Sequence, residues 1–243
     1  MSCEYRPDLS HIHHVGFGDY SLSAAPGLLK LLRQAKIIGA QVVDLGCGSG
    51  LWLHELCREA YDVVGIDASA AMLEIARRTA PDARLLHGSV LDVEIPPCDA
   101  VTAIGEVLCY ITDGADGTSA LAKVFKKVSE ALPVTGLFIF DLLVSTAGKL
   151  MNYRTWRAGR DWAVLTQVTE DQDGGLLVRD ITTFRRCGEH YRKDQESHVL
   201  RVYSRADVER ELRRAGFSVR CSRSIGEFRL PPRRMAFVAR KRE

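Results

Sequence analysis

The stretch VVDLGCGSG, residues 42–50, decides the fold of this chain. Its apolar β-formers flank an acid and run into a turn with glycine at every second position, a pattern typical of a central parallel strand followed by a glycine-rich loop. Glycine lets the backbone turn sharply and lie close against a ligand, because a Cβ would keep the ligand out. A helix is predicted from Leu51, and its first amides would face that ligand. Asp44 stands at the strand's carboxyl end, where open α/β sheets bind ligands.

A second strand completes this signal. The run DVVGID, residues 62–67, is hydrophobic and ends in an acid, Asp67. A carboxylate at the tip of the second strand can accept both hydroxyl protons of a ribose. The two strands together therefore predict a cofactor that contains a nucleoside.

The spacing of the glycines separates two cofactor classes. A dinucleotide fingerprint has glycine at its first, third and sixth positions, but here the sixth position is Leu51 and the third glycine comes early, at Gly50. An acid followed by Gly-x-Gly-x-Gly instead resembles the first motif of the class I S-adenosylmethionine-dependent methyltransferases. The stretch GIDASAAML, residues 65–73, resembles the second motif of that family, including its Ser and Met-Leu. This resemblance implies S-adenosylmethionine as the cofactor and methyl transfer as the activity.

Composition excludes several other classes of protein. The chain has 243 residues, 46% of them hydrophobic and 26% charged, which is ordinary for a soluble globular protein. A net charge of +2 indicates no bulk attraction to nucleic acid or to a membrane. No secretory signal or membrane-spanning run is found in the sequence. Seven scattered cysteines without a Cys-x-x-Cys pair favour reduced thiols in a cytoplasmic protein.

Alternating strand and helix patterns predict an α/β fold. We expect a doubly wound, mostly parallel, seven-stranded sheet, the Rossmann-like methyltransferase fold, with an antiparallel β meander of three strands inserted after strand five. An amphipathic helix is expected over residues 25–38, with Pro26 in its first turn. Within the boundary error of such readings, the expected parts are an N-terminal helical lid (1–39), a cofactor-binding methyltransferase domain (40–150 and 204–243) and an insertion that roofs the acceptor pocket (151–203).

The resemblance also implies which residues would hold the cofactor. The glycine loop and its amides would hold the methionine part, Asp67 the ribose, and Asp44 the amino group or the loop itself. The family often carries an acid after the third strand to bind the adenine; here that place is Ser89, so Ser89 or the Val90 amide would serve instead. The aromatic segment ahead of the first strand either folds over the cofactor as a lid or anchors the leader helix. The full predicted set is Tyr20, Asp44, Gly46, Cys47, Gly48, Gly50, Asp67, Ala68, Met72, Ser89, Val90 and Gly105.

Two residues are predicted to be catalytic. Glu106 follows the fourth strand, where the family borders both sulfonium and acceptor; the alternative is a carboxylate that caps a helix. His198 lies on one face of a meander strand with Glu196, which could orient the imidazole or raise its pKa; the alternative is a solvated sheet face. Either residue could take a proton from the acceptor.

The histidines at positions 11, 13 and 14 suggest a metal site, but no carboxylate or cysteine stands at ligand spacing beside them, so we predict no metal. His14 is favoured instead as a contact to the substrate.

We therefore expect methyl transfer from S-adenosylmethionine to an N or O atom of a small-molecule acceptor, with no nucleic-acid or membrane partner. The base-methylase sequence of Asn/Asp-Pro-Pro-aromatic type is absent after strand four, and there is no basic recognition module. Two alternatives remain: a non-catalytic protein that binds the nucleoside cofactor, and an NAD-dependent oxidoreductase. A homodimer is left open by the sequence.

Overall fold

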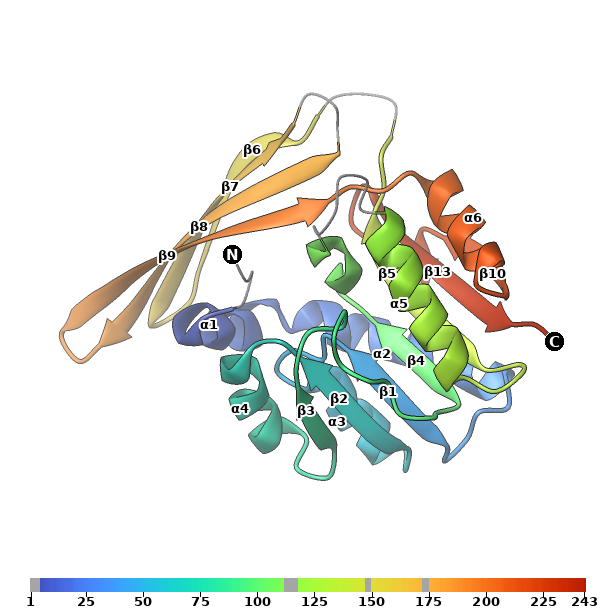
Figure 1. The fold of residues 1–243 in the computed structure, drawn as a ribbon. Coiled ribbons are helices and arrows are strands. Elements are labelled where there is room, and N and C mark those ends of the chain that lie inside the picture. The colour runs from blue at the N-terminus through green and yellow to red at the C-terminus, as the bar shows by residue number, and fades with distance from the viewer. Residues whose placement is uncertain (1–4, 112–117, 147–149, 172–174) are drawn as a thin grey trace.

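The computed structural model describes residues 5–111, 118–146, 150–171 and 175–243, and Figure 1 draws it as a ribbon. Its body is a seven-stranded sheet made of β1 (Gln41–Leu45), β2 (Asp62–Asp67), β3 (Arg84–His87), β4 (Ala100–Ala103), β5 (Leu137–Leu143), β10 (Phe217–Ser222) and β13 (Arg234–Lys241). The strand order is β10-β13-β5-β4-β1-β2-β3, with β1 to β5 parallel and β13 antiparallel to its two neighbours. The predicted doubly wound, mostly parallel sheet is confirmed.

Helices cover both faces of this sheet (Figure 1). Successive residues of β1 belong to different cores: Val42 packs with the helices of one face, and Val43 with those of the other. This alternation follows from the two-residue period of a strand. The first face carries α2 (Asp19–Gln34), α3 (Leu51–Arg58) and α4 (Ala70–Thr79), and the second carries α5 (Thr118–Ala131) and α6 (Arg205–Arg214).

The cap positions of two helices differ in chemistry. Ser69 caps α4, since its hydroxyl accepts the amide of Met72 at 3.1 Å. Ser204 occupies the same position on α6 but makes no side-chain cap hydrogen bond. Of the two serines, only Ser69 therefore caps its helix through its side chain.

The insertion after β5 is a four-stranded antiparallel sheet, not the three strands that the sequence predicts. It consists of β6 (Asn152–Ala158), β7 (Trp162–Glu170), β8 (Leu176–Cys187) and β9 (His190–Arg201), in that order. The first strand was missed because it lies at an edge with every residue exposed, so its sequence shows no alternation of apolar and polar side chains. The sequence DQDGG, residues 171–175, also predicts a hairpin turn between β7 and β8, but residues 172–174 lie outside the described segments.

The N-terminal part contains two helices where one was predicted. Helix α1 (Pro7–Phe17) covers the histidine-rich segment, and α2 begins at Asp19, well before the predicted start. Pro26 therefore lies inside α2 and not in its first turn. Proline leaves the carbonyl four residues earlier without its amide partner. That residue, Leu22, is 46% exposed and lies on the solvent side of the helix.

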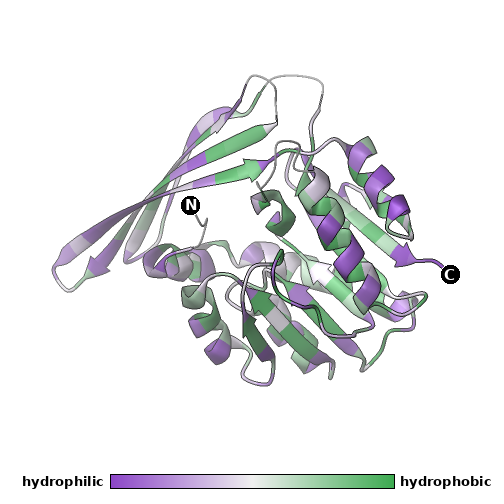
Figure 2. Ribbon diagram, viewed as in Figure 1, coloured by the Kyte–Doolittle hydropathy of each residue, from purple (hydrophilic) through white to green (hydrophobic). Residues whose placement is uncertain are grey.

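Helix α1 packs against the meander. Leu9 and Ile12 from α1 share a small core with three meander residues, Trp162, Val164 and Ile181. Charge reinforces this contact: Arg192 donates two hydrogen bonds to Asp8, at 2.5 and 2.6 Å, and Arg185 a third at 3.2 Å. Figure 2 shows the contrast in hydropathy, with hydrophobic residues concentrated in the central strands of the main sheet and hydrophilic residues along the part of β9 that lies away from that sheet.

The chain also contains two short motifs. A 3-10 helix, η1 (Val107–Tyr110), follows β4, and a short hairpin pairs β11 (Ser224–Ile225) with β12 (Phe228–Arg229). The six cysteines of the described segments carry free thiols, while Cys3 lies outside those segments. Within the same segments, none of the helices combines the length and low polarity needed to cross a bilayer.

Candidate functional site

A cavity of about 610 Å³ lies at the carboxyl ends of β1, β2 and β4, between the main sheet and the meander. This volume falls in the range of small-molecule sites. Its walls come from the loops that follow these strands, from residues of helices α1 to α4, from one face of the meander strands and from Arg234 at the start of β13. The two ends of the cavity are therefore built from different kinds of structure.

The glycine loop forms part of the cavity wall. Gly46, Gly48 and Gly50 all have positive φ, of 64°, 54° and 80°, a conformation that disfavours other residues. A Cβ on Gly46 would lie 2.4 Å from Val107, whereas a Cβ on Gly48 would meet nothing within 4 Å. Gly50 differs from the prediction, because it is not among the lining residues. It precedes helix α3 in a left-handed conformation, and a Cβ at this position would lie 3.0 Å from Ala76.

Asp67 connects the two sequence motifs. Its carboxylate accepts the amide of Gly48 at 2.8 Å and the amide of Ser69 at 2.8 Å. It also lines the cavity at the end of β2. The acid therefore holds the glycine loop in place as well as facing the space where a ligand would lie.

Asp44 lies below the loop and is only 3% exposed. Thr102 donates a 2.6 Å hydrogen bond to Asp44, and Trp52 donates in turn to the Thr102 hydroxyl at 3.1 Å. Burial raises the pKa of Asp44 to about 7, and the nearby Asp67 adds to this, while the bond from Thr102 opposes it. A cation brought beside this carboxyl would stabilise its ionised form.

The remaining wall at this end is apolar or neutral. Ser89 accepts the amide of Leu91 at 3.2 Å through its hydroxyl. Burial holds the pKa of the Cys47 thiol well above its usual value, so the thiol is neutral. Every predicted cofactor residue except Gly50 lines this one cavity: Tyr20, Asp44, Gly46, Cys47, Gly48, Asp67, Ala68, Met72, Ser89, Val90 and Gly105.

An acid that the sequence reading did not single out organises the loop after β4. Asp141 on β5 is fully buried and accepts the amides of Gly105 at 2.6 Å and Glu106 at 3.3 Å. It also accepts the hydroxyl of Tyr20 at 3.0 Å. Burial raises the pKa of Asp141, although Arg234 and these hydrogen bonds oppose the shift. The available signal was the single acid in the apolar run LFIFDLL, residues 137–143.

Glu106 is held between two arginines. Its carboxylate receives Arg234 at 2.7 Å and Arg179 at 2.8 Å, and its side chain is 2% exposed. Burial alone would raise the pKa of Glu106, but the two guanidiniums outweigh it and keep the pKa below its ordinary value. A carboxylate with a lowered pKa is a poor proton acceptor. The ion pairs thus argue against Glu106 as the general base and favour a positioning role.

His198 does not line the cavity, contrary to what its predicted catalytic role needs. Its ring is buried behind Tyr5 and Tyr110, whose ring centroids lie 4.9 and 5.8 Å away. Its Nε2 donates to Glu196 at 3.0 Å. The predicted pairing of these two side chains on one strand face is present. Sequence reasoning could not foresee the two tyrosines, which come from distant segments.

The imidazole that lines the cavity is that of His13, on α1. Its pKa is lowered to about 4 by burial, with His14 and Arg234 adding to the effect, so the ring is neutral at pH 7. His14 instead makes a 3.0 Å contact through Nδ1 to the hydroxyl of Ser49, in the glycine loop. Across the described part of the chain, no three side chains of metal-ligating type come together. His13 and His14 are thus differently placed: His13 lines the cavity, and His14 contacts the glycine loop.

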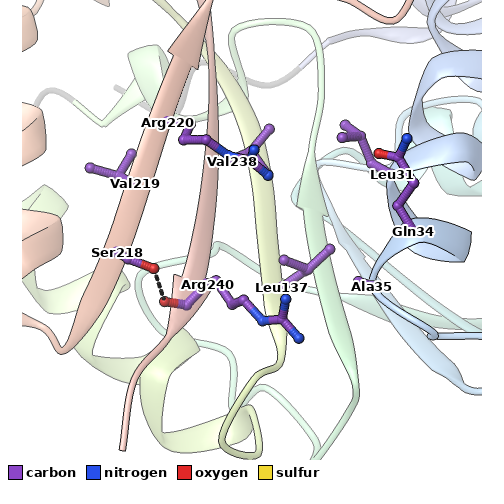
Figure 3. Close-up of a pocket in the computed structure, with 9 residues that line it drawn as sticks. All are labelled: Leu31, Gln34, Ala35, Leu137, Ser218, Val219, Arg220, Val238 and Arg240. Atoms are coloured by element: carbon purple, nitrogen blue, oxygen red, sulfur yellow. Dashed lines mark hydrogen bonds between the residues drawn. The ribbon is translucent and has the colours of Figure 1, made fainter.

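A second, smaller depression of about 340 Å³ lies elsewhere (Figure 3). It is formed by the end of α2 together with β5, β10 and β13, and Ser218 donates there to the backbone oxygen of Arg240 at 3.2 Å. None of the predicted site residues contributes to it. The first cavity is the candidate site.

A doubly wound sheet here places its glycine loop and the acid at the end of β2 beside one cavity. This combination of fold and site is typical of one class of protein. Comparison with known proteins finds similarity to methyltransferases. Residues 42–132 match the model of a methyltransferase domain. The chain is also 29% identical, over 219 residues, to a dTDP-3-amino-3,6-dideoxy-α-D-glucopyranose N,N-dimethyltransferase from Streptomyces fradiae, covering 87% of this chain and 83% of that one. Both matches are to methyltransferases, in agreement with the two sequence motifs that resemble the class I S-adenosylmethionine-dependent methyltransferases.

Solved structures agree on the fold. An S-adenosylmethionine-dependent methyltransferase from Clostridium acetobutylicum superposes with a TM-score of 0.82 at 21% identity, over 96% of this chain and 98% of that one. The sugar N-methyltransferase KedS8 from Streptoalloteichus superposes with a TM-score of 0.81 at 20% identity, over 99% and 95%. The second comparison spans nearly the whole chain, so its fold extends through the meander as well as the main sheet.

The cavity fits S-adenosylmethionine, the cofactor of this family. Gly48 and Gly105 both line it with positive φ, and a Cβ on either would enter open space. Side chains at these positions would therefore occupy the ligand's volume. The site also offers two acids, Asp44 and Asp67, to a ligand that carries an ammonium and a ribose.

Proposed function

We propose that this enzyme transfers a methyl group from S-adenosylmethionine to a nitrogen or oxygen atom of a small-molecule acceptor. The observation that carries the proposal is the composition of the one cavity: its floor is the glycine loop with Asp67, and its roof is the meander. The relative from S. fradiae is named for dimethylation of an amino sugar linked to a nucleotide. We therefore propose an amino group on such a sugar as the first acceptor to test.

The floor residues would hold the cofactor. Gly46 and Gly48 leave room for its methionine part, Asp67 would accept the ribose hydroxyls, and Asp44 would face its amino group. When bound, the cofactor supplies a methyl group activated by its sulfonium. Ser89, Val90 and Met72 line the part of the wall that suits an adenine ring.

The chain's own contribution to the rate would be alignment. Holding an acceptor in line with the methyl can supply roughly 7–11 kcal/mol. Asp141 fixes the backbone of Gly105 and Glu106, and so fixes the edge of the cavity between floor and roof. Because Glu106 is paired with arginines and His198 is covered, the neutral ring of His13 is the imidazole best situated to accept a hydrogen bond from the acceptor.

The test is calorimetric titration with S-adenosylmethionine, S-adenosylhomocysteine and NAD, followed by a methyl-transfer assay on nucleotide-linked amino sugars read by mass spectrometry. We expect binding of the first two ligands and not of NAD. Asp67→Asn should weaken binding of both, because an amide cannot accept two hydroxyl protons as a carboxylate does.

The matched control is Asp62→Asn, at the opposite end of the same strand, where the residue is exposed and its carboxylate accepts a hydrogen bond from the Gln41 side chain. Equal losses in the two variants would contradict the role assigned to Asp67. If the protein binds the cofactor but methylates no amino or hydroxyl acceptor, the proposed acceptor class is wrong and the protein is a non-catalytic cofactor-binding protein.

A further inference from the structure

Two guanidiniums from different parts of the fold meet at the roof side of the cavity. Arg179 comes from the meander strand β8, and Arg234 begins β13 of the main sheet. Glu106 joins them, with one carboxylate oxygen on each. Both arginines line the cavity, and their side chains are only 19% and 17% exposed. Such burial removes much of the water that would otherwise solvate the two charges.

The two arginines differ in the number of contacts that their guanidiniums make. Arg234 donates from Nε to Glu106, lies 3.8 Å from Asp141, and stacks its guanidinium 4.5 Å above the ring of Tyr20. Arg179 has a contact to Glu106 through Nη2. Within the described segments its Nε and Nη1 donate no hydrogen bond. These two nitrogens are not among the buried polar atoms without a partner, so they can donate to a ligand in the cavity that Arg179 lines.

Charge points the same way. Arg234 lies within ion-pair distance of both Glu106 and Asp141, whereas Arg179 pairs with Glu106. Arg179 therefore brings a positive charge to the meander side of the cavity, whereas the floor carries Asp44 and Asp67. A floor suited to a cationic cofactor faces a roof suited to an anion.

The roof around Arg179 also presents hydroxyls. Thr155 and Thr166 stand directly opposite each other on β6 and β7, and both line the cavity. Ile181, which lies opposite Thr166 on β8, lines it too, on the same sheet face as Arg179. Hydroxyls beside a guanidinium are a suitable set of donors for a phosphoryl or carboxylate group.

We propose that Arg179, braced by Glu106 and Arg234, is the subsite for an oxyanion carried by the acceptor, either a phosphoryl or a carboxylate group. The inference rests on the proposed function, since it takes the meander side of the cavity as the acceptor side. It deepens that function by naming the group through which the acceptor is held. Arg179 acts here as a specificity residue and takes no part in the chemistry.

The experiment is titration of two anions into the enzyme saturated with S-adenosylhomocysteine: pyrophosphate for a phosphoryl source and acetate for a carboxylate source. Saturation keeps the anions out of the cofactor's own half. We expect saturable binding of one anion, weakened about tenfold in Arg179→Gln because a charge-assisted hydrogen bond is lost. Arg179→Lys keeps the charge opposite Glu106 but loses the planar fork, so it should bind the anion more weakly than the native enzyme.

Arg154→Gln is the matched control. Arg154 lies on the outer face of the same meander, bonded to Gln167, and its loss removes one positive charge without touching the cavity. Equal anion binding by the Arg154 and Arg179 variants, or no saturable binding of either anion, would overturn the proposal. Binding of S-adenosylhomocysteine itself should not change in either variant. Loss of that binding in the native enzyme would instead refute the proposed function, so the two failures are distinguishable.

Discussion

The hydroxyl of Ser69 donates a hydrogen bond to the carbonyl oxygen of Tyr5 across 2.6 Å. The same hydroxyl oxygen accepts the amide of Met72 and caps helix α4. One side chain thus ties the segment ahead of α1 to the helix that follows Asp67. Because Tyr5 also lines the cavity, this contact sets how closely the N-terminal segment covers it.

Ser69→Ala should therefore have two effects. It should lower the free energy of unfolding by about 1 kcal/mol through the lost cap, and it should speed amide hydrogen exchange in α1. The measurements are chemical denaturation and hydrogen exchange with mass spectrometry. Ser204→Ala is the control, since Ser204 makes no side-chain cap bond and should change both quantities much less. Similar changes in the two variants would show that the Ser69 contacts do not hold the segment.

Cofactor affinity should depend on pH through Asp44. Its pKa is raised from 3.8 to about 7, chiefly by burial. The folded protein therefore keeps a proton that the unfolded chain loses near pH 4, and the contribution of Asp44 to stability falls as pH rises between these values. A bound ammonium reverses the preference, so binding should expel the proton. We expect affinity for S-adenosylmethionine to fall by up to tenfold per unit as the pH drops below 7.

Titration calorimetry in two buffers of different ionisation enthalpy measures the released proton directly. Asp44→Asn should bind more weakly at pH 8 and should lose the pH dependence below 7. A variant that keeps the native pH profile would exclude Asp44 as its source.

Sequence patterns predicted the main sheet and the floor of the cavity because both depend on local chemistry. An apolar run followed by a glycine turn indicates a strand end wherever it occurs, and the acids Asp44 and Asp67 fall at such ends. Most of the predicted cofactor residues consequently lie together along the cavity. The edge strand β6 escaped notice because it buries neither face.

The roof side could not be predicted in the same way, because it depends on long-range pairing. Arg234 reaches Glu106 only because β13 pairs with β5, and Arg179 reaches it only because the meander folds back over the loop. The two-residue period put His198 and Glu196 on one face, as found. Periodicity carries no information about Tyr5, whose ring covers that histidine.

The ion pairs between Asp8 of α1 and the meander should contribute more to stability than an exposed ion pair does. Asp8 is 4% exposed, and hydrogen bonding by Arg192, helped by Arg185, holds its pKa below the usual value despite burial. A lowered pKa stabilises the fold above about pH 4, the unfolded value, and that contribution disappears as the pH falls through the folded pKa. Asp8→Asn should therefore lower Tm by several degrees at pH 7.

The effect of Asp8→Asn should shrink as the pH is lowered below 4. Asp19→Asn provides the comparison, because the Asp19 carboxylate is 73% exposed in its pair with Arg157 and such pairs contribute little. Differential scanning calorimetry at several pH values gives both results. A pH-independent loss for Asp8→Asn would mean that packing and not charge explains it.

The last prediction concerns the packing of α1 on the roof. A Cβ on Gly16 would lie 2.5 Å from Cη2 of Trp162, a ring held in the core shared by α1 and the meander. Gly16→Ala should therefore destabilise the protein by about 1–3 kcal/mol, the usual range for overpacking. Val15, the preceding residue of the same helix, is 51% exposed, so Val15→Ala should change stability by no more than about 0.5 kcal/mol. Combining Gly16→Ala with Trp162→Phe relieves the clash, so denaturation of the double variant should show less destabilisation than the sum of the two single losses. Strict additivity would mean that the two residues do not press on each other.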